Sequence, residues 1–122
     1  MNRLVLLIAF SLVTFLSCKK TGIILPSVTT DKIGVVTSHS TECSGTVLND
    51  GNTQLTARGV CWSKNHNPSI TDFVNKEAIH IGPYVSVIYN LTPATVYYLR
   101  AFASNSKGTS YGEEKTFTTL SQ

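Results

Sequence analysis

The sequence has few charged residues and no cluster of charge of one sign. Ten lysines and arginines and seven aspartates and glutamates give a formal net charge of +3 over 122 residues, and the basic residues are scattered along the chain. A protein that binds nucleic acid usually carries a basic patch or stripe, so the sequence predicts no nucleic-acid partner. There is also no internal repeat, which excludes a repeat architecture.

Motifs of catalysis are equally absent. The sequence contains no G-x-S-x-G, H-E-x-x-H, phosphate-loop or C-x-x-C pattern. Its one adjacent acidic pair, Glu113 and Glu114, would point to opposite faces of a strand. His39, His66 and His80 lack metal-ligand spacing and are expected to be solvated loop residues. We therefore expect no enzyme, with no catalytic residue, cofactor or metal site; a hydrolase is the least favoured alternative.

The chain begins with a short apolar run. Arg3 precedes residues 4–16, which are nearly all apolar, and Ser17 and Cys18 follow. A helix of this length spans about 20 Å, which is short of the roughly 30 Å of a bilayer's hydrocarbon core. The pattern therefore indicates a signal peptide over residues 1–17 rather than a permanent transmembrane helix.

The end of that run resembles a bacterial lipobox. In the sequence Phe15-Leu16-Ser17-Cys18, cleavage before Cys18 would leave this cysteine as the site of lipidation. The acyl chains would hold the protein on a membrane. An ordinary signal followed by an unmodified cysteine is the alternative. Residues 18–25 are then expected to form a lipidated tether in front of the folded domain.

Residues 91–103 alternate with the period of a strand that buries one face. Pro93 disfavours the strand interior, so the strand is expected to begin just after it. Tyr97 then lies at the corner where a core strand begins, which predicts a tyrosine corner with a buried ring and a hydroxyl bonded to the preceding backbone. A tight turn at residues 105–108 and a closing strand over residues 111–119 follow. The core set of the alternation is Leu91, Pro93, Thr95, Tyr97, Leu99, Ala101 and Ala103.

The run L-x-P-x-T-x-Y-x-L-R-A-x-A-x-N-x-x-G-x-x-Y-G, closed by F-T-T, resembles the last two strands of fibronectin type III-like domains of Bacteroidetes lipoproteins. The N-D-G at residues 49–51, the T-A-R-G-V-C-W-S at 56–63 and the N-P-S-I at 67–70 resemble the same family. The resemblance covers residues 26–120. It implies an all-β, immunoglobulin-like antiparallel sandwich of about seven strands that serves as a binding, spacing or display module.

Other strands are expected at residues 41–47, 55–63 and 84–89, with a turn at 49–52 and a long loop over 64–82. The first strand is expected as two short pieces, 28–30 and 33–36, broken at Asp31 and Lys32. Trp62 shares a face with Val60, and a single tryptophan beside β-branched residues predicts a core position.

Cys43 and Cys61 remain once Cys18 is assigned to lipid. An exported protein meets an oxidising environment, so a disulfide between them is possible. Strand parity favours the alternative of two buried or half-buried free thiols, because Cys61 would point away from the core if Val60 and Trp62 point inward.

On the other face of the strand after Pro93, Tyr98, Arg100 and Phe102 form a candidate binding stripe, which aromatic stacking and cation–π contacts would serve. A sheet surface stabilised by cross-strand pairs is the alternative. Together with the long loop over residues 64–82, this stripe is the predicted contact surface.

We therefore expect an envelope-anchored binding, adhesion or assembly module whose partner is an envelope protein or, alternatively, a glycan. Bacteroidetes lipoproteins displayed on the cell surface often carry acidic residues after the lipidated cysteine, whereas this chain has Lys19 and Lys20. The expected location is the outer membrane, facing the periplasm or the cell surface. A coplanar aromatic pair in a groove would favour a glycan, convergent carboxylates an enzyme, and an apolar patch or free edge strand a protein partner.

Overall fold

The computed structural model of the protein describes residues 22–122, so the predicted signal peptide and Cys18 lie outside the described residues. The described chain contains eight strands and no helix that could cross a membrane. The strands are β1 (Ser27–Val36), β2 (Thr41–Asn49), β3 (Ala57–Ser63), β4 (Phe73–Lys76), β5 (Gly82–Ile88), β6 (Val96–Asn105), β7 (Gly108–Tyr111) and β8 (Lys115–Thr118).

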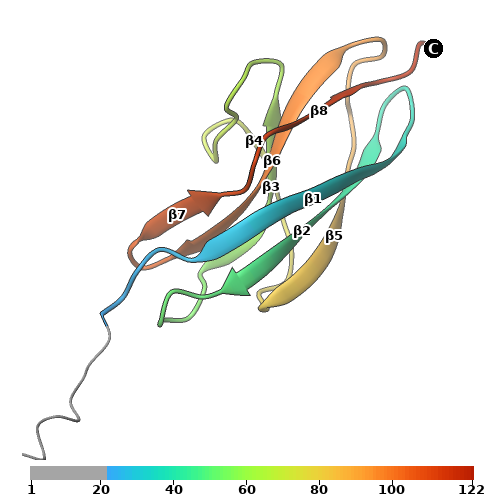
Figure 1. Ribbon diagram of the computed structural model, residues 1–122. Coiled ribbons are helices and arrows are strands. Elements are labelled where there is room, and N and C mark those ends of the chain that lie inside the picture. The colour runs from blue at the N-terminus through green and yellow to red at the C-terminus, as the bar shows by residue number, and fades with distance from the viewer. Residues whose placement is uncertain (1–21) are drawn as a thin grey trace, which may run out of the picture.

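The strands form two antiparallel sheets that pack face to face (Figure 1). One sheet has the order β1-β2-β5, and the other has the order β4-β3-β6 with β7 and β8 both paired to β6. The predicted all-β antiparallel sandwich is confirmed. In this arrangement β4 and β5 are the outer strands of their sheets.

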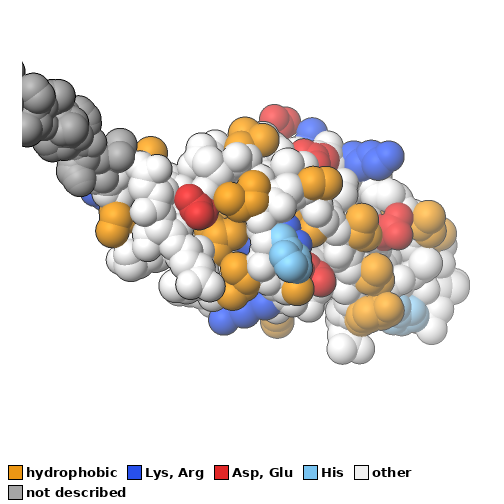
Figure 2. All heavy atoms as spheres, turned by 90° about the horizontal axis from the view of Figure 1, so that it is seen from below, with side chains coloured by type: hydrophobic (Ala, Val, Ile, Leu, Met, Phe, Trp, Pro, Cys, Tyr) orange, Lys and Arg blue, Asp and Glu red, His pale blue; other side chains and the backbone are white. Residues whose placement is uncertain are grey.

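The core forms as the alternation in β6 predicts. Tyr97, Leu99, Ala101 and Ala103 are buried and belong to the hydrophobic cluster between the sheets. Trp62 of β3 belongs to the same cluster and is only 9% exposed, which confirms its predicted place in the core. The hydrophobic side chains left on the surface lie in separate groups between mostly uncharged polar ones on the face shown in Figure 2.

Three predicted segments differ from the structure. β1 is continuous, because Asp31 and Lys32 form an irregularity in the register with β2 rather than a break. The predicted closing strand is divided into β7 and β8 by residues 112–114. The predicted loop over residues 64–82 contains β4, a strand that was not predicted. These changes raise the number of strands from about seven to eight.

Gly59 explains how β4 can pair with β3. It has a φ of +159°, and a β-carbon built on it would lie 1.9 Å from the carbonyl oxygen of Asn75 in β4. The backbone of β4 therefore comes so close to β3 that only glycine fits at this position. Gly59 itself pairs in register with Lys76.

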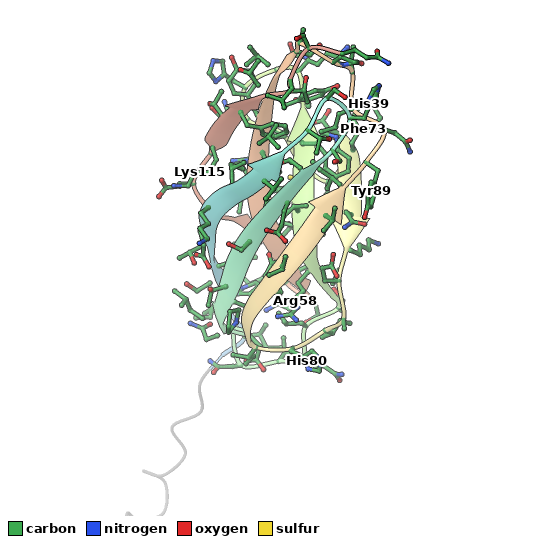
Figure 3. The ribbon with its side chains drawn as sticks, turned by 90° about the vertical axis from the view of Figure 1, so that its right-hand side faces the viewer. His39, Arg58, Phe73, His80, Tyr89 and Lys115 are labelled. Carbon is green, nitrogen blue, oxygen red and sulfur yellow. The ribbon has the colours of Figure 1, made fainter. Side chains whose placement is uncertain are left out.

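The described part of the predicted tether is not free. The Ile24 N–H donates a hydrogen bond to the Gly51 carbonyl at 3.0 Å, and the Asn52 side chain donates one to the Gly22 carbonyl at 3.0 Å. The chain thus enters the sandwich at the end where Arg58 and His80 lie. His39 and Phe73 lie toward the opposite end, and Tyr89 lies between the two ends (Figure 3).

Candidate functional site

The predicted binding stripe on β6 is not an exposed surface. Phe102 is 1% exposed, and Tyr98 and Arg100 are half-buried. The prediction of a free stripe is therefore wrong. Alternation placed these three side chains on the outer face of the sheet correctly, but the chain itself covers that face.

The cover is the segment between β3 and β4, residues 64–72. The Arg100 guanidinium donates from Nε and Nη2 to the Pro68 carbonyl at 2.8 and 2.6 Å. It also lies 4.1 Å from the centre of the Tyr111 ring. The His66 ring lies 4.1 Å from the Tyr98 ring, centre to centre. The polar part of the stripe is used to hold this segment against the sheet.

Glu114 fastens the same segment from the break between β7 and β8. Its carboxylate accepts hydrogen bonds from the Asn67 N–H and from His66 Nδ1, the latter at 2.7 Å. The bond from the Asn67 N–H, followed by the one from His66, lowers the pKa of Glu114. Glu113 instead pairs with Lys115 at 3.2 Å, so the adjacent carboxylates do not converge.

Cys43 and Cys61 are free thiols in the structure, so the possible disulfide is not formed there. Cys43 lies in the core and donates to the Ser86 carbonyl at 3.5 Å, whereas Cys61 donates to the Arg100 carbonyl at 3.6 Å. Burial is the main cause that raises the pKa of Cys43 to about 12 and that of Cys61 to about 11. Both cysteines are therefore protonated packing residues.

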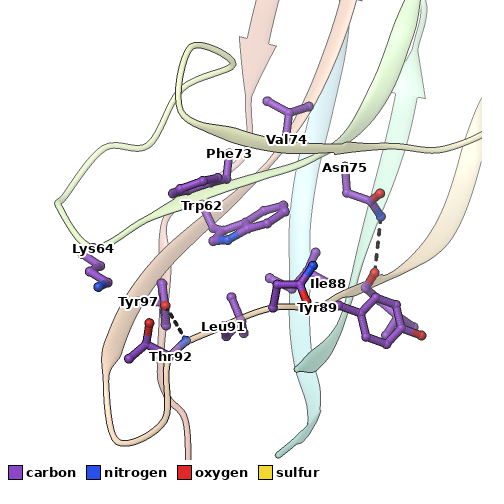
Figure 4. A pocket seen from close by; sticks show the side chains of 12 residues that line it. Trp62, Lys64, Phe73, Val74, Asn75, Ile88, Tyr89, Leu91, Thr92 and Tyr97 are labelled. Atoms are coloured by element: carbon purple, nitrogen blue, oxygen red, sulfur yellow. Dashed lines mark hydrogen bonds between the residues drawn. The ribbon is translucent and has the colours of Figure 1, made fainter. Parts of the chain in front are cut away.

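An open cleft of about 480 Å³ lies where the edges of β4 and β5 face each other across the open side of the sandwich (Figure 4). We call it the edge cleft. Its lining is mainly aromatic, apolar and amide, with one cation. The lining residues are Trp62, Lys64, Phe73, Val74, Asn75, Val87, Ile88, Tyr89, Asn90, Leu91, Thr92 and Tyr97.

Two of the aromatic side chains that line the edge cleft pack on each other. Trp62 belongs to the hydrophobic core, and the Phe73 ring stacks on the Trp62 ring with the ring centres 5.9 Å apart and the planes 22° apart. Phe73 is 63% exposed and Tyr89 is 65% exposed. Figure 4 shows the Phe73 and Trp62 rings one above the other, with Tyr89 on the opposite side of the cleft. The edge cleft thus has two exposed aromatic rings, and one of them, Phe73, is supported by a core residue.

A polar bridge ties β4 to β5 beside the edge cleft. The Asn75 amide donates to the Val87 carbonyl at 3.5 Å and to the Glu77 carboxylate at 3.0 Å. The buried Ser86 hydroxyl donates to the same carboxylate at 2.6 Å. These bonds satisfy polar groups that the open side of the sandwich would otherwise leave unpaired. They also fix the spacing of the two edge strands.

The polar side chains that line the edge cleft are those of Lys64, Asn75, Asn90, Thr92 and two tyrosines. No carboxylate, histidine or cysteine is among its lining residues, all of which lie in the described part of the chain. Residues 22–122 also contain no group of three potential metal-ligating side chains. What the cleft can do is bind by stacking, burial of apolar surface and a few hydrogen bonds.

The edge cleft was not predicted from the sequence because its residues come from four separate segments. Phe73 did lie in the long loop that was predicted as part of the contact surface. The signal in the sequence was an aromatic residue at each end of the stretch from Phe73 to Tyr89. Only the pairing of β4 with β3 brings these two residues to the same opening.

Comparison with solved structures identifies the fold. The chain is similar to the sensor domain of the anti-sigma factor RsgI4 of Pseudobacteroides cellulosolvens, in the shorter of its two solved forms, with a TM-score of 0.60 and 16% identity over 83% of this chain and 100% of that one. It is also similar to the third fibronectin III domain of the human KIAA0343 protein, with a TM-score of 0.53 and 20% identity over 87% of this chain and 92% of that one.

No protein-family model and no curated protein sequence matches the chain. At these identities the structural likeness speaks for the fold alone. The protein has a fibronectin type III-like fold, as its sequence resemblance implied.

Proposed function

We propose that the protein is a lipid-anchored, non-catalytic binding module of the bacterial cell envelope, and that it binds a protein partner through the edge cleft. The observation that carries this proposal is the position of the cleft between two strands, β4 and β5, each of which is the outer strand of its sheet. The lipid anchor rests on the signal-like start of the chain and on Cys18.

An extended peptide segment suits this site. A strand at the edge of a sheet can pair with an added strand, while neighbouring pockets take alternate side chains. Val85 and Val87 of β5 point outward, and Tyr89 continues this alternation just after the strand ends. Every second side chain at this edge, from Val85 to Tyr89, is therefore apolar or aromatic and exposed. Phe73 supplies an aromatic wall on the other side of the cleft. Rigid exposed aromatic residues of this kind often dominate binding energies.

The test is affinity selection from a displayed library of random peptides, followed by measurement of the selected peptides on variants. Phe73→Ala should weaken binding by about 2 kcal/mol, which is roughly 30-fold, if the ring is a central anchor. Ile70→Ala is the matched control, because Ile70 is also an exposed apolar residue, lies three residues before Phe73 and does not line the edge cleft. Peptides that bind Phe73→Ala and the parent protein equally would reject this site.

A glycan is the second candidate, because the exposed Phe73 ring, which is backed by Trp62, lines an open groove. Sugar rings stack on such surfaces, although Trp62 is itself mostly covered. The chain has a single tryptophan, so its fluorescence reports directly on the edge cleft. A change in that fluorescence on titration with soluble envelope polysaccharides, lost in Phe73→Ala, would favour the glycan over the peptide.

A further inference from the structure

The end of the sandwich where the described chain begins carries a group of exposed aliphatic side chains. They come from three places: the first described residues, the end of β2 and the connection between β4 and β5. We call this group the base. Its members are Ile23, Ile24, Leu25, Leu48, Ile79 and Ile81, all of them exposed.

The three parts of the base lie around the same turn, residues 49–52. The Asn105 side chain donates to the carbonyls of Ile24 and Asp50, at 2.8 and 2.9 Å. Asp50 lines a small pocket together with Ile79 and Ile81. Gly82, next to Ile81, pairs with Val47, which precedes Leu48.

The connection that carries Ile79 and Ile81 is itself held rigidly. The buried Arg58 guanidinium donates to the carbonyls of Ala78, His80 and Gly82. It also lies 4.5 Å from the centre of the Tyr84 ring. With its backbone fixed in this way, the connection presents its two isoleucines to the outside. Figure 2 shows hydrophobic side chains close to where the described chain begins.

We propose that the base rests on the lipid surface to which Cys18 is attached, an inference that depends on the lipid anchor of the proposed function. The argument for this contact is the short stretch of chain between Cys18 and the folded domain, which we call the leash. Only residues 19–21 separate Cys18 from Gly22, whose carbonyl is already bonded to Asn52. Four residue steps reach at most about 14 Å even when fully extended. The domain therefore cannot move its base far from the membrane.

Charge is compatible with this contact. Lys19 and Lys20 lie in the leash, and the exposed Lys107 lies in the turn between β6 and β7 at the same end. Basic residues near a membrane surface are attracted to anionic headgroups, and aliphatic side chains enter the interface beside them. Asp50 is half-buried in the turn behind the base.

The contact also determines the direction of the binding site. Phe73 lies toward the end of the molecule opposite His80 and Arg58, and Tyr89 lies nearer the middle (Figure 3). Strands of seven to ten residues span about 23 to 33 Å. A domain seated on its base therefore presents the edge cleft away from the bilayer, where a partner can reach it.

The test uses the full chain, processed and purified in its acylated form and reconstituted into vesicles of phosphatidylethanolamine and phosphatidylglycerol. A nitroxide spin label is placed at Ile81→Cys in one variant and at Val35→Cys in another. Val35 is the matched control, because it is an exposed aliphatic residue near the far end of β1. Power saturation then reports whether oxygen from the lipid or a water-soluble nickel complex reaches each label.

We expect the Ile81 label to be accessible to oxygen and protected from nickel by about fivefold or more relative to the Val35 label, since the hydrocarbon core of the bilayer excludes the polar, hydrated complex. Because a label could enter the lipid by itself, a second variant carries the label at Leu48→Cys and adds Ile79→Glu and Ile81→Glu. The two carboxylates should return the Leu48 label to water.

Each outcome decides a different point. If mass spectrometry finds no acyl chains on Cys18, the anchor and the seating of the base are both rejected. If the protein is acylated but the Ile81 and Val35 labels behave alike, the seating of the base is wrong and the anchor stands. Spin–spin broadening between Ile81 labels would show a second copy of the chain on this face and would equally overturn the inference.

Discussion

The Thr92 backbone N–H donates a hydrogen bond to the hydroxyl of Tyr97 at 2.9 Å. The Tyr97 ring is buried and stacks on Phe117 with the ring centres 5.6 Å apart. The bond closes the connection from β5 to β6 against the core, as the tyrosine corner predicted from the sequence requires. We expect Tyr97→Phe to lower the free energy of unfolding by about 1 kcal/mol or somewhat more, since the Thr92 donor loses its partner.

Denaturant melts measure this change. Tyr89→Phe serves as the control, because the Tyr89 ring is mostly exposed and its variant should melt like the parent protein. Equal midpoints for Tyr97→Phe and Tyr89→Phe would contradict the role given to the Thr92–Tyr97 bond.

Phe102 provides a second prediction about stability. It is among the largest fully buried side chains, although it points to the outer face of its sheet. We expect Phe102→Ala to cost about 3 kcal/mol or more, because removing a buried phenyl ring leaves a cavity. Val96→Ala, on the same face of β6 but exposed, should cost much less. Similar losses in the two variants would mean that residues 64–72 do not cover the sheet in solution.

The buried thiols predict low chemical reactivity. Thiolates are the reactive form, and the pKa of Cys43 is raised to about 12 and that of Cys61 to about 11. At pH 8 an alkylating reagent should therefore modify both residues far more slowly in the native protein than in denaturant. Mass spectrometry over a time course gives the two rates. Rapid native modification of Cys61 alone would show that residues 64–72 open often.

The same pKa values predict a trend with pH. A folded-state pKa above the unfolded value, about 8.5 for cysteine, contributes stability below that value. The contribution is lost as the pH rises toward 11 and 12, because the unfolded chain releases the protons first. The loss of stability between pH 8 and pH 10.5 should therefore be smaller in a Cys43→Ala, Cys61→Ala variant than in the parent protein.

Local pattern was enough to predict β6, the tyrosine corner and the core position of Trp62, because each depends on alternation and burial along one strand. The segment over residues 64–82 was beyond such reasoning. β4 has only four residues, and its pairing depends on the room that Gly59 leaves in another strand. The burial of Phe102 likewise depends on a distant segment, which the bond from Arg100 to the Pro68 carbonyl holds in place.

The edge cleft was hidden for a related reason. Trp62 and Tyr97 were predicted correctly as core residues, yet one side of each borders an opening. Neither residue type nor spacing shows on which side a sandwich stays open. That side is fixed by strand order, which makes β4 and β5 the outer strands that face each other.

The lipid anchor gives a prediction that a single mass measurement decides. The apolar run over residues 4–16 ends just before Cys18 and is too short to span a bilayer as a helix. The mature protein should begin at Cys18 and carry added acyl mass on that residue. Cys18→Ser should abolish both the acyl mass and the cleavage before residue 18. An intact Met1, or an unmodified Cys18 in a soluble protein, would contradict the anchor.

Gly59 and Gly22 form a matched pair for the last prediction, which concerns the structure around the edge cleft. A β-carbon at Gly59 would lie 1.9 Å from the Asn75 carbonyl oxygen, whereas one at Gly22 would meet nothing within 4 Å. Gly59→Ala should therefore push β4 away from β3 and lower the free energy of unfolding by about 1 to 3 kcal/mol, the range typical of overpacking. Gly22→Ala should have little effect.

Because Phe73 lies on β4, Gly59→Ala should also disturb its stacking on Trp62 and change the tryptophan emission of the native protein. Unchanged stability and emission in Gly59→Ala would mean that β4 does not pair with β3 in solution, and the edge cleft would then lack its outer wall.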